Sequence, residues 1–469
     1  MLTETLVGEL RTLLGADQVL TDPDIVQAAA VDTWPLRLVQ RAVGGQPGPG
    51  PRCVVRPNSR ADVSAALAYL YERGVAVVPR GGGTGVLGGA EAPRDSVVLD
   101  LTRLDQIVGL DELNHSVTAE AGVRLERLEA WLNERGYVSG HYPQSIRTAQ
   151  LGGLVATRSS GQLSTRYGSI EDLLLGFEAV LPDGAPVRLT PAPRRAAGPD
   201  VRQLFIGSEG AFGVLTEVTL KVFPKPASTW RGAFAVANMI DGFNMLRGIV
   251  QAGWRPAALR LYDPVETARS FGGATKRGQC ILICAAEGPT GLPGIEGAAI
   301  ESAARRSGAT ELGAQPVDAW FEHRNDVSAL LQYVQSGTIV DIVDVGAGWD
   351  AIAHVYAAVL DALNADVPEL VMASAHASHA YAQGTNLYFT VGAQPPRDAR
   401  EVERVYRAMW SAAMDAVLAN GGSISHHHGI GKLRAAWLER ELGSSYVVLR
   451  RLKGAFDPRG TMNPGTLLP

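Results

Sequence analysis

The chain has 469 residues, of which 46% are hydrophobic and 19% charged, and its formal net charge is −5. Because a nucleic-acid-binding surface is normally basic, this charge disfavours nucleic acid, and we expect a small-molecule substrate. Single cores stop growing near about 250 to 300 residues, so we expect at least two domains. A membrane-spanning helix needs about 18 apolar residues in a row, and since no run approaches this length, we expect no membrane span.

The first part of the chain predicts a helical segment and then an α/β unit. Residues 1–15, MLTETLVGELRTLLG, place leucines at helical spacing and lack the charged and apolar regions of a signal peptide. From Arg52, a β-branched run, a helix that begins after Ser59 and the apolar run VAVVP predict strand, helix and strand. We expect an N-terminal helical segment over residues 1–45 and a first domain over residues 46–226.

The middle of the chain continues the first domain and then changes character. SVVLDLTRL, SVTAEAGV, LLLGFEAVLPDG and FGVLTEVTLKVFP predict strands, LERLEAWLNERG predicts a helix, and TPAPRRAAGPD predicts an exposed loop. After Pro224, the strands CILICAAEG and LYFTVGA and the helix WDAIAHVYAAVLDALN predict a second α/β domain over residues 227–400. A C-terminal segment over residues 401–469 follows it.

Glycine clusters follow three of the predicted strands. PRGGGTG, residues 79–85, fits either a tight turn or a backbone cradle for an anion, since successive N–H groups without a Cβ can surround a phosphate. It matches neither a Walker loop nor GxGxxG. LGGLVATRSSG, residues 151–161, and IGSEGAFGVLTEV, residues 206–218, add two more glycine-rich loops. Together they predict one large, extended ligand.

These loops, with VLPDG between the second and third and FDPRGTMNPGTLLP at the end, resemble the vanillyl-alcohol oxidase, or p-cresol methylhydroxylase (PCMH), family. The resemblance implies an α+β fold: a two-subdomain PCMH-type FAD-binding domain, an α/β cap over the substrate and a C-terminal helical segment that returns to the flavin. It implies noncovalent FAD, because Thr84 stands where some members tether the flavin to a histidine. The residues that it implies for FAD binding are Pro79, Arg80, Gly81, Gly82, Gly83, Thr84, Gly85, Pro143, Ser145, Gly152, Gly153, Thr157, Arg158, Ser159, Ser160, Glu209, Gly213 and Val214.

Three consecutive histidines, His426, His427 and His428, lie in GGSISHHHGIGKLRAAW, residues 421–437. Adjacent side chains point in different directions, so at most two rings can meet one ion, and we expect no metal site. A polar turn packed on the last helix and an active-site role both fit the pattern. Three buried imidazoles without a ligand would be costly, which favours the active site.

The run SHHHG, together with YGSIEDL, AALRLYD and SHAYAQGTNLYFTVG, is similar to the ether-lipid branch of the family, the alkylglycerone-phosphate synthases. D-lactate and glycolate dehydrogenases of this fold carry EHG-type and HxGDGNxH-type motifs instead. The resemblance implies that Tyr388 is a general acid/base, that the three histidines lie beside the flavin, and that Arg260 and Arg324 bind substrate. From the residues alone, Tyr388 fits a core tyrosine better than a catalytic one. A salt bridge of the cap and phosphate binding fit Arg260 equally well.

The chemistry implied by this branch is an exchange without net redox. An acylated dihydroxyacetone phosphate forms an adduct with flavin N5, the fatty acid leaves and a fatty alcohol replaces it. The alternatives are an FAD-linked oxidase or dehydrogenase of a 2-hydroxy acid or alcohol, with hydride transfer to N5, and a noncatalytic flavin-binding protein. We also expect a lipid-derived phosphate ester as substrate, a homodimer, and a cytoplasmic, bacterial-type protein that contacts the membrane peripherally.

Overall fold

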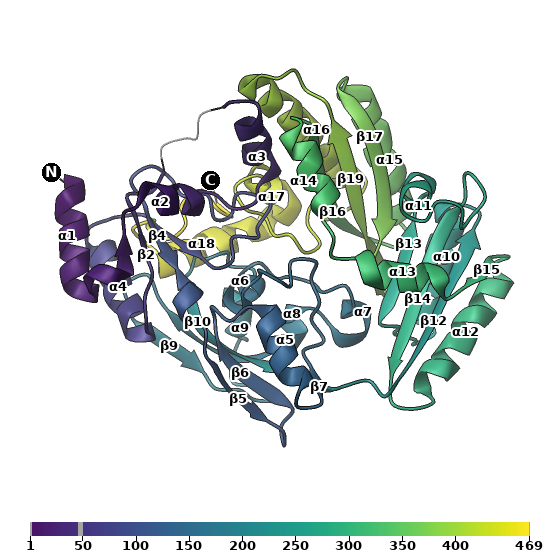
Figure 1. The fold of residues 1–469 in the computed structure, drawn as a ribbon, viewed down its shortest axis with the longest axis horizontal. Coiled ribbons are helices and arrows are strands. Elements are labelled where there is room, and N and C mark those ends of the chain that lie inside the picture. Colours follow the sequence, from purple (N-terminus) through teal and green to yellow (C-terminus); the bar gives the residue numbers. More distant parts are fainter. Residues whose placement is uncertain (1, 46–49, 469) are drawn as a thin grey trace.

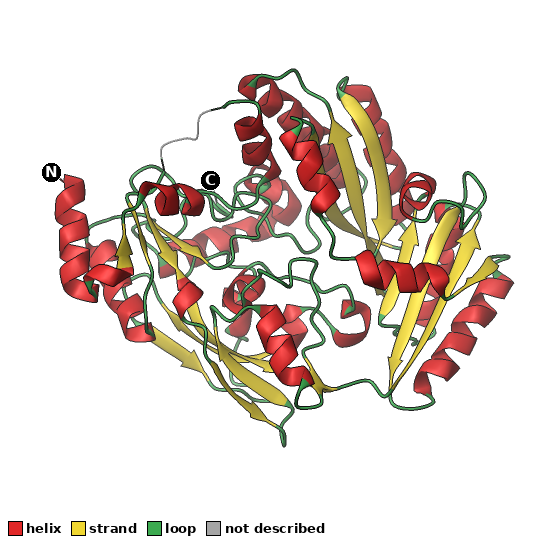
Figure 2. Ribbon diagram, in the orientation of Figure 1, coloured by secondary structure: helices red, strands yellow, loops and turns green. Residues whose placement is uncertain are grey.

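The computed structural model describes residues 2–45 and 50–468, and it places a domain with two main sheets beside a domain with one large sheet (Figures 1 and 2). The N-terminal segment forms α1 (Leu2–Leu14), β1 (Val19–Leu20), α2 (Pro23–Ala29) and α3 (Pro35–Ala42). Since β1 pairs with β2 (Cys53–Val55), this segment is not purely helical, and its strand extends the first sheet.

The first domain contains a four-stranded and a five-stranded sheet within the described chain. The order in the first is β1-β2-β4-β3, and in the second β5-β6-β10-β8-β9. Their remaining strands are β3 (Val77–Arg80), β4 (Val97–Asp100), β5 (Ile107–Asp111), β6 (Ser116–Glu120), β8 (Leu174–Val180), β9 (Pro186–Leu189) and β10 (Val214–Lys221). The short strands β7 (Tyr137–Val138) and β11 (Phe223–Pro224) pair with each other.

The two helices that the sequence predicts in this domain are present as α4 (Arg60–Glu72) and α5 (Leu125–Asn133). In α4, the Ser59 side chain accepts a hydrogen bond from the backbone N–H of Asp62, which satisfies one of the free amides at the helix start. The short helices that were not predicted are α6 (Leu151–Ala156), α7 (Ser164–Tyr167), α8 (Ile170–Leu173) and α9 (Arg202–Phe205). The predicted loop TPAPRRAAGPD is confirmed, because it contains no helix or strand and its residues are mostly exposed.

The cap is built on an eight-stranded sheet. Its main order is β15-β12-β14-β13-β17-β19-β16, and β18 pairs with β19 at one side. The strands are β12 (Ser228–Val236), β13 (Ala258–Tyr262), β14 (Cys280–Gly288), β15 (Thr310–Gly313), β16 (Ile339–Gly348), β17 (Leu370–Ala377), β18 (Ala380–Tyr381) and β19 (Gly384–Ala393). The helices are α10 (Met239–Gln251), α11 (Pro264–Ser270), α12 (Leu292–Arg306), α13 (Gln315–His323), α14 (Ser328–Gln335), α15 (Ile352–Asp366) and α16 (Ala399–Ala419).

The two faces of the cap sheet have different neighbours. Alternate residues of β14, such as Leu282 and Cys284, pack into the large core formed with α10, α12, α15 and α16. The residues between them, Ile281 and Ile283, pack on the opposite face with Trp320 of α13 and Leu163 of the first domain. Because side chains alternate along a strand, the second face of the sheet looks toward the FAD-binding loops.

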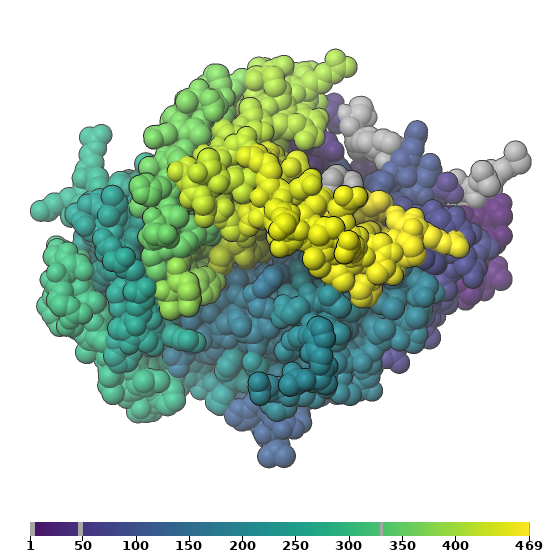
Figure 3. Space-filling model, turned by 180° about the vertical axis from the view of Figure 1, so that it is seen from behind, coloured from purple at the N-terminus to yellow at the C-terminus, as the bar shows by residue number. Residues whose placement is uncertain are grey.

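The C-terminal segment joins the two domains. Helix α16 crosses the predicted boundary between residues 400 and 401, because its apolar face belongs to the core of the cap. Only the chain beyond it returns to the first domain, through α17 (Ala435–Leu442) and α18 (Tyr446–Phe456). Figure 3 shows this yellow segment spread between the green cap and the blue and purple first domain. Among the described residues, no helix is long and apolar enough to cross a membrane.

Candidate active site

A single row of residues crosses the face of the cap sheet that looks toward the first domain. In the ladder, Tyr262 of β13 lies opposite His376 of β17, His376 lies opposite Tyr388 of β19, and Tyr388 lies opposite Asp344 of β16. The neighbouring residues on the same strands, including Ala375, Phe389 and Val345, point into the apolar core on the other face. Strand alternation therefore gathers polar groups from four strands, which are far apart in sequence, into one site.

Asp344 binds the histidine run through its backbone. Its Oδ2 accepts hydrogen bonds from the N–H groups of His426, His427 and His428 at 3.0, 2.7 and 3.0 Å. Its Oδ1 accepts one from Nη2 of Arg434 at 2.6 Å, and both side chains are fully buried. Burial alone would raise the pKa of Asp344, but the charge of Arg434 and the nearby histidines hold it well below its ordinary value. The carboxylate is thus ionised at neutral pH.

A second buried carboxylate holds the next turn of the same loop. The Oε1 and Oε2 atoms of Glu209, in the third glycine-rich loop, accept hydrogen bonds from the N–H groups of Ile430 and Gly431 at 2.7 and 2.8 Å. Burial raises the pKa of Glu209 to about 7, and these two amides and Arg434 oppose that shift. The loop that carries the histidines is therefore fixed between the cap, through Asp344, and the first domain.

Because their backbone is fixed, the three histidine rings pack together and against Tyr388. Ring centroids of Tyr388 and His427 are 6.1 Å apart with nearly parallel planes, and those of Tyr388 and His428 are 5.6 Å apart. The interplanar angle between His426 and His427 is 80°, so adjacent rings do point in different directions. Burial lowers the pKa of His426 to about 3 and that of His427 well below 6.5. Both rings are neutral at pH 7 and can each accept a proton.

Tyr388 lies between the histidine run and a further histidine of the cap. Its ring also stacks on His376, at 4.7 Å between centroids, so it has imidazoles on more than one side. Burial raises the pKa of Tyr388 above its ordinary value of 10, so the hydroxyl is protonated at neutral pH. The structure thus brings the predicted acid/base and all three predicted histidines into one cluster.

Two arginines lie beside this cluster around one indole ring. The guanidinium carbons of Arg260 and Arg324 are 5.1 and 5.5 Å from the centroid of Trp320. Within residues 2–45 and 50–468, neither arginine has a carboxylate within ion-pair distance, and Nη1 of Arg324 is buried without a hydrogen-bond partner. Burial and the charge of Arg260 lower the pKa of Arg324, whereas Tyr142 opposes this shift. One buried and one partly buried guanidinium, neither in direct contact with a carboxylate, can together bind an anion.

The orientation of Arg260 depends on two residues that the sequence analysis did not single out. Its Nη2 lies 2.7 Å from Nε2 of His376, and Nδ1 of His376 lies 3.0 Å from Oε1 of Glu266. Arginine has only donors, so Nε2 must accept and Nδ1 must carry the proton that is donated to Glu266. Burial lowers the pKa of His376 and keeps the ring neutral, as this arrangement requires. The Nε of Arg260 donates to the hydroxyl of Tyr262.

The three predicted glycine-rich loops converge in the first domain. A Cβ on Gly82 would overlap the carbonyl oxygen of Thr148, and one on Gly210 would lie 2.9 Å from Cγ of Pro79. The first loop therefore lies directly against the residues that precede the second glycine-rich stretch and against the third loop. Within the described chain, no backbone N–H of residues 82–85 donates to a backbone carbonyl. These free donors and the close approach of the backbones fit the pyrophosphate of FAD.

The other predicted cofactor residues divide into two groups. Ser159 and Ser160 lie in the second loop, where Ser159 Oγ is 2.7 Å from Nε2 of the fully buried His141, whose Nδ1 has no partner among the described residues. By contrast, the Arg80 side chain donates to carbonyls at the end of α2, and that of Val214 packs in the core of the first domain. The Arg158 side chain pairs with Glu171, and the Thr157 hydroxyl donates to the carbonyl oxygen of Gly153.

No set of three or more His, Cys, Asp or Glu side chains in the described chain is arranged to hold a metal ion.

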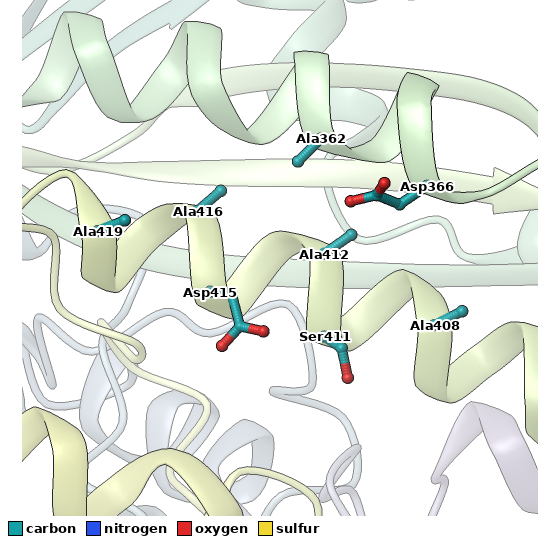
Figure 4. Close-up of a pocket in the computed structure, with 8 residues that line it drawn as sticks. All are labelled: Ala362, Asp366, Ala408, Ser411, Ala412, Asp415, Ala416 and Ala419. Atoms are coloured by element: carbon teal, nitrogen blue, oxygen red, sulfur yellow. The ribbon is translucent and has the colours of Figure 1, made fainter.

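A surface groove of about 470 Å³ lies between α15 and α16 (Figure 4). Ala362, Ala412, Ala416 and Asp415 are among the residues that line it, and Asp415 is paired with Arg440. None of the predicted site residues lines this groove, so we assign it to the packing of two small-residue helices.

Sequence reasoning missed the residues that position the site. Asp344, His376, Glu266 and Arg434 belong to no motif that carries chemistry by itself. A signal was present, since a buried acid or histidine in an apolar strand, as in IVDIVDVGAG and LVMASAHA, needs a partner. The sequence alone could not identify the partner, because Asp344 and His427 are 83 residues apart.

Comparisons with known proteins match the whole chain. The FAD binding domain model matches residues 51–190, and the model for the C-terminal domain of FAD linked oxidases matches residues 225–467. The uncharacterized FAD-linked oxidoreductase YgcU of Escherichia coli K12 is 38% identical, over 99% of this chain and 98% of the relative. The alkyldihydroxyacetonephosphate synthase of Trypanosoma brucei brucei is 30% identical, over 99% of this chain and 80% of the relative.

A solved structure of an alkyldihydroxyacetonephosphate synthase superposes with a TM-score of 0.82 at 25% identity, covering 98% of this chain and 85% of that one. The α+β fold with a PCMH-type FAD-binding domain and a cap is confirmed, and the protein is a flavoenzyme that uses FAD.

Gly82→Ala tests the cofactor cradle. The added Cβ would overlap the Thr148 carbonyl, so the first loop must move away from residues 148–150, and we expect FAD binding to weaken by about tenfold or more. Flavin fluorescence on titration of the stripped protein measures this change. Gly248→Ala is the control, because its Cβ would meet nothing within 4 Å. Equal FAD affinity of the Gly82 variant and wild type would contradict the assignment of the loop.

Asp344→Asn tests the clamp on the histidine run. The variant leaves the buried Arg434 without its charge partner and removes an acceptor, so we expect a loss of about 3 to 5 kcal/mol of stability. Urea unfolding followed by circular dichroism measures it. Asp361→Asn, an exposed change on α15, is the matched control. If Asp344→Asn unfolds at the same urea concentration as the control, the Asp344 carboxylate does not stabilise the fold as we propose.

Proposed function

Because this chain belongs to the family of FAD-linked oxidases, we propose that it exchanges the acyl group of an acylated dihydroxyacetone phosphate for a fatty alcohol. The similarity to alkyldihydroxyacetonephosphate synthases over nearly the full chain supports this choice of reaction. The motifs SHHHG and NLYFTV, which carried the resemblance, supply the side chains that surround the proposed reaction site.

The observation that carries the proposal is the arginine pair without a counter-charge. Arg260 and Arg324 flank Trp320, and neither is neutralised by a carboxylate among the described residues. A phosphate monoester carries a charge of about −1.5 to −2 and several strong acceptors, so it can satisfy both guanidinium groups at once. Since His376 links Arg260 to Tyr388, a phosphate bound there would bring the adjoining carbons of the substrate toward the tyrosine and the histidines.

The chain's own residues have distinct roles in this reaction. Neutral His427 can accept the proton that leaves the carbon next to the carbonyl, and Tyr388 holds a proton that it can donate to a leaving oxygen. Bound FAD would supply a reactive ring that accepts the substrate carbon or a hydride. Asp344 and Glu209 keep the histidine loop fixed while protons move, because both bind its backbone N–H groups. The Oδ1 atom of Asp344 also lies 3.0 Å from Nδ1 of His428.

The setting of the protein follows from the proposed substrate. We propose noncovalent FAD, because Thr84 cannot form the histidyl link. We also propose that the protein is a cytoplasmic homodimer. Because its proposed substrate derives from a lipid, we expect it to contact the membrane only at its surface. The division into an N-terminal segment, an FAD-binding domain, a cap and a returning C-terminal segment remains our proposal for the domain organisation.

A second candidate is oxidation of a 2-hydroxy acid. The uncharacterized FAD-linked oxidoreductase YgcU is more similar to this chain, at 38% identity, than the synthase, at 30%, and its name supports oxidation but indicates no substrate. A carboxylate can bind Arg260 and Arg324 as a phosphate does, and His427 can take the hydroxyl proton.

An anaerobic titration of the FAD-loaded protein, followed by its visible spectrum, separates the two functions. Loss of the flavin colour with an acylated dihydroxyacetone phosphate, and its return when a fatty alcohol is added, supports the exchange reaction. Loss of the flavin colour only with a D-2-hydroxy acid, reversed by an electron acceptor, contradicts the proposed exchange reaction and supports oxidation.

Arg324→Met tests the anion site. Since a hydrogen bond to a charged group contributes about 1.5 to 3 kcal/mol, we expect the KM for the phosphate substrate, or the Kd for dihydroxyacetone phosphate, to rise about 10- to 100-fold. Steady-state kinetics and calorimetry measure the two constants. Arg305→Met, at an arginine side chain that is 66% exposed on α12, is the control. Unchanged affinity in the Arg324 variant would place the phosphate elsewhere.

A further inference from the structure

A chain of hydrogen bonds leads from the histidine run toward the edge of the cap. Nδ1 of His427 lies 2.8 Å from Nδ1 of His426, and Nε2 of His426 lies 2.8 Å from Oη of Tyr381. Tyr381 is 39% exposed, whereas the side chain of His427 is only 13% exposed. The roles assigned above use neither Tyr381 nor the second nitrogen of His426.

Each group in this chain can both donate and accept a hydrogen bond. A neutral imidazole carries one N–H and one bare nitrogen, and a phenol has an O–H and lone pairs. The Nδ1 to Nδ1 contact requires one of the two histidines to donate to the other. If His427 donates, its Nε2 is bare and His426 donates from Nε2 to Tyr381. If His426 donates, every proton in the chain has moved one position outward, toward Tyr381. The two arrangements differ by the passage of one proton.

Tyr381 is held firmly at the outer end. It lies in β18, which pairs with β19, and Nε1 of Trp349 donates to its carbonyl oxygen at 3.1 Å. Its hydroxyl faces the start of α8, where Ser169 bonds to it and Glu171 and Asp172 contribute negative charge. A negative potential at the outer end attracts a proton that arrives there.

We propose that His427, His426 and Tyr381 form a proton relay that carries the proton removed from the substrate to solvent. This role rests on the proposed function only in requiring proton removal from carbon or from a hydroxyl. A proton binds to Nε2 of His427, the Nδ1 proton of His427 passes to Nδ1 of His426, the Nε2 proton of His426 passes to Oη of Tyr381, and the phenolic proton passes to water. One proton enters, one leaves, and nothing is oxidised or reduced.

The relay explains how weakly basic histidines can serve as the base. Because burial keeps His426 and His427 neutral, neither can retain an extra proton for long in this site. The charges that face the relay are Asp344 at its inner end, and Glu171 and Asp172 at its outer end. Arg434, which also faces His427, is paired with Asp344. Removal of the proton to solvent would leave Tyr388 protonated for the later step.

The test uses the resting, FAD-loaded protein and needs no substrate. In protein labelled with ¹⁵N-histidine, magnetisation transfer from water to the ring N–H groups of His426 and His427 reports their proton exchange. Tyr381→Phe keeps the ring and removes only the hydroxyl, so we expect the exchange to slow by about tenfold or more. Tyr333→Phe, at a surface tyrosine that is 55% exposed, is the control and should exchange like wild type. Unchanged exchange in the Tyr381 variant overturns the relay.

A second variant separates a lost relay from damaged structure. His426→Gln can still form hydrogen bonds, but its amide does not pass protons on, so exchange at His427 should slow as it does in Tyr381→Phe. The double variant should be no slower than either single one, because all three interrupt the same path. Additive slowing would contradict the relay. FAD absorbance and the melting temperature verify that each variant is folded.

Turnover in deuterium oxide then links the relay to the reaction. With an acylated dihydroxyacetone phosphate and a fatty alcohol, wild type should place solvent deuterium on the reacting carbon of the ether, while Tyr381→Phe should return the original hydrogen. If wild type forms no ether at all, the proposed exchange fails, and the magnetisation-transfer result still decides the relay. Equal deuterium in the two products would overturn it.

Discussion

The carboxylate of Asp344 is the interaction on which the site depends. One of its oxygens accepts three consecutive amides of the histidine loop, and the other pairs with the buried Arg434. The loop is long and polar, and it would not otherwise remain in a crevice between two domains, because its backbone groups would lose water without replacement. A charge buried with four donors replaces that water and fixes His426 to His428 in one arrangement.

The alternation of side chains along the cap strands explains why chemistry and core do not interfere. Residues of β16, β17 and β19 that point one way form a large apolar core with α15 and α16. Those that point the other way, Asp344, His376 and Tyr388, form the reactive row. The same sheet therefore gains stability from one face and presents ionisable groups on the other. At that second face, neutral histidines lie beside two unneutralised arginines, which is a suitable environment for a base that acts on an anionic substrate.

Much of the fold, and the position of the cofactor site, could be predicted from the sequence. The glycine clusters predicted an extended cofactor site, and the structure brings the first and third into contact at Gly210. The second begins as the short helix α6, and Gly82 of the first loop contacts Thr148 just before it. Strand and helix patterns predicted the cap, although α16 extends past the expected boundary because its packing, not its local sequence, decides where it belongs. Asp344, Glu266 and His376 could not be assigned, since their roles arise only from cross-strand pairing and from contacts over about a hundred residues, such as that of Glu266 with His376.

The most direct measurement is a crystal structure of the FAD-loaded protein with dihydroxyacetone phosphate. The account predicts that phosphate oxygens lie about 2.7 to 3.1 Å from guanidinium nitrogens of both Arg260 and Arg324, with the carbonyl carbon facing Tyr388 and the histidine run. A phosphate bound away from both arginines, or a carbonyl group turned away from Tyr388, would contradict the central claim that the arginine pair and the clamped histidines form one active site.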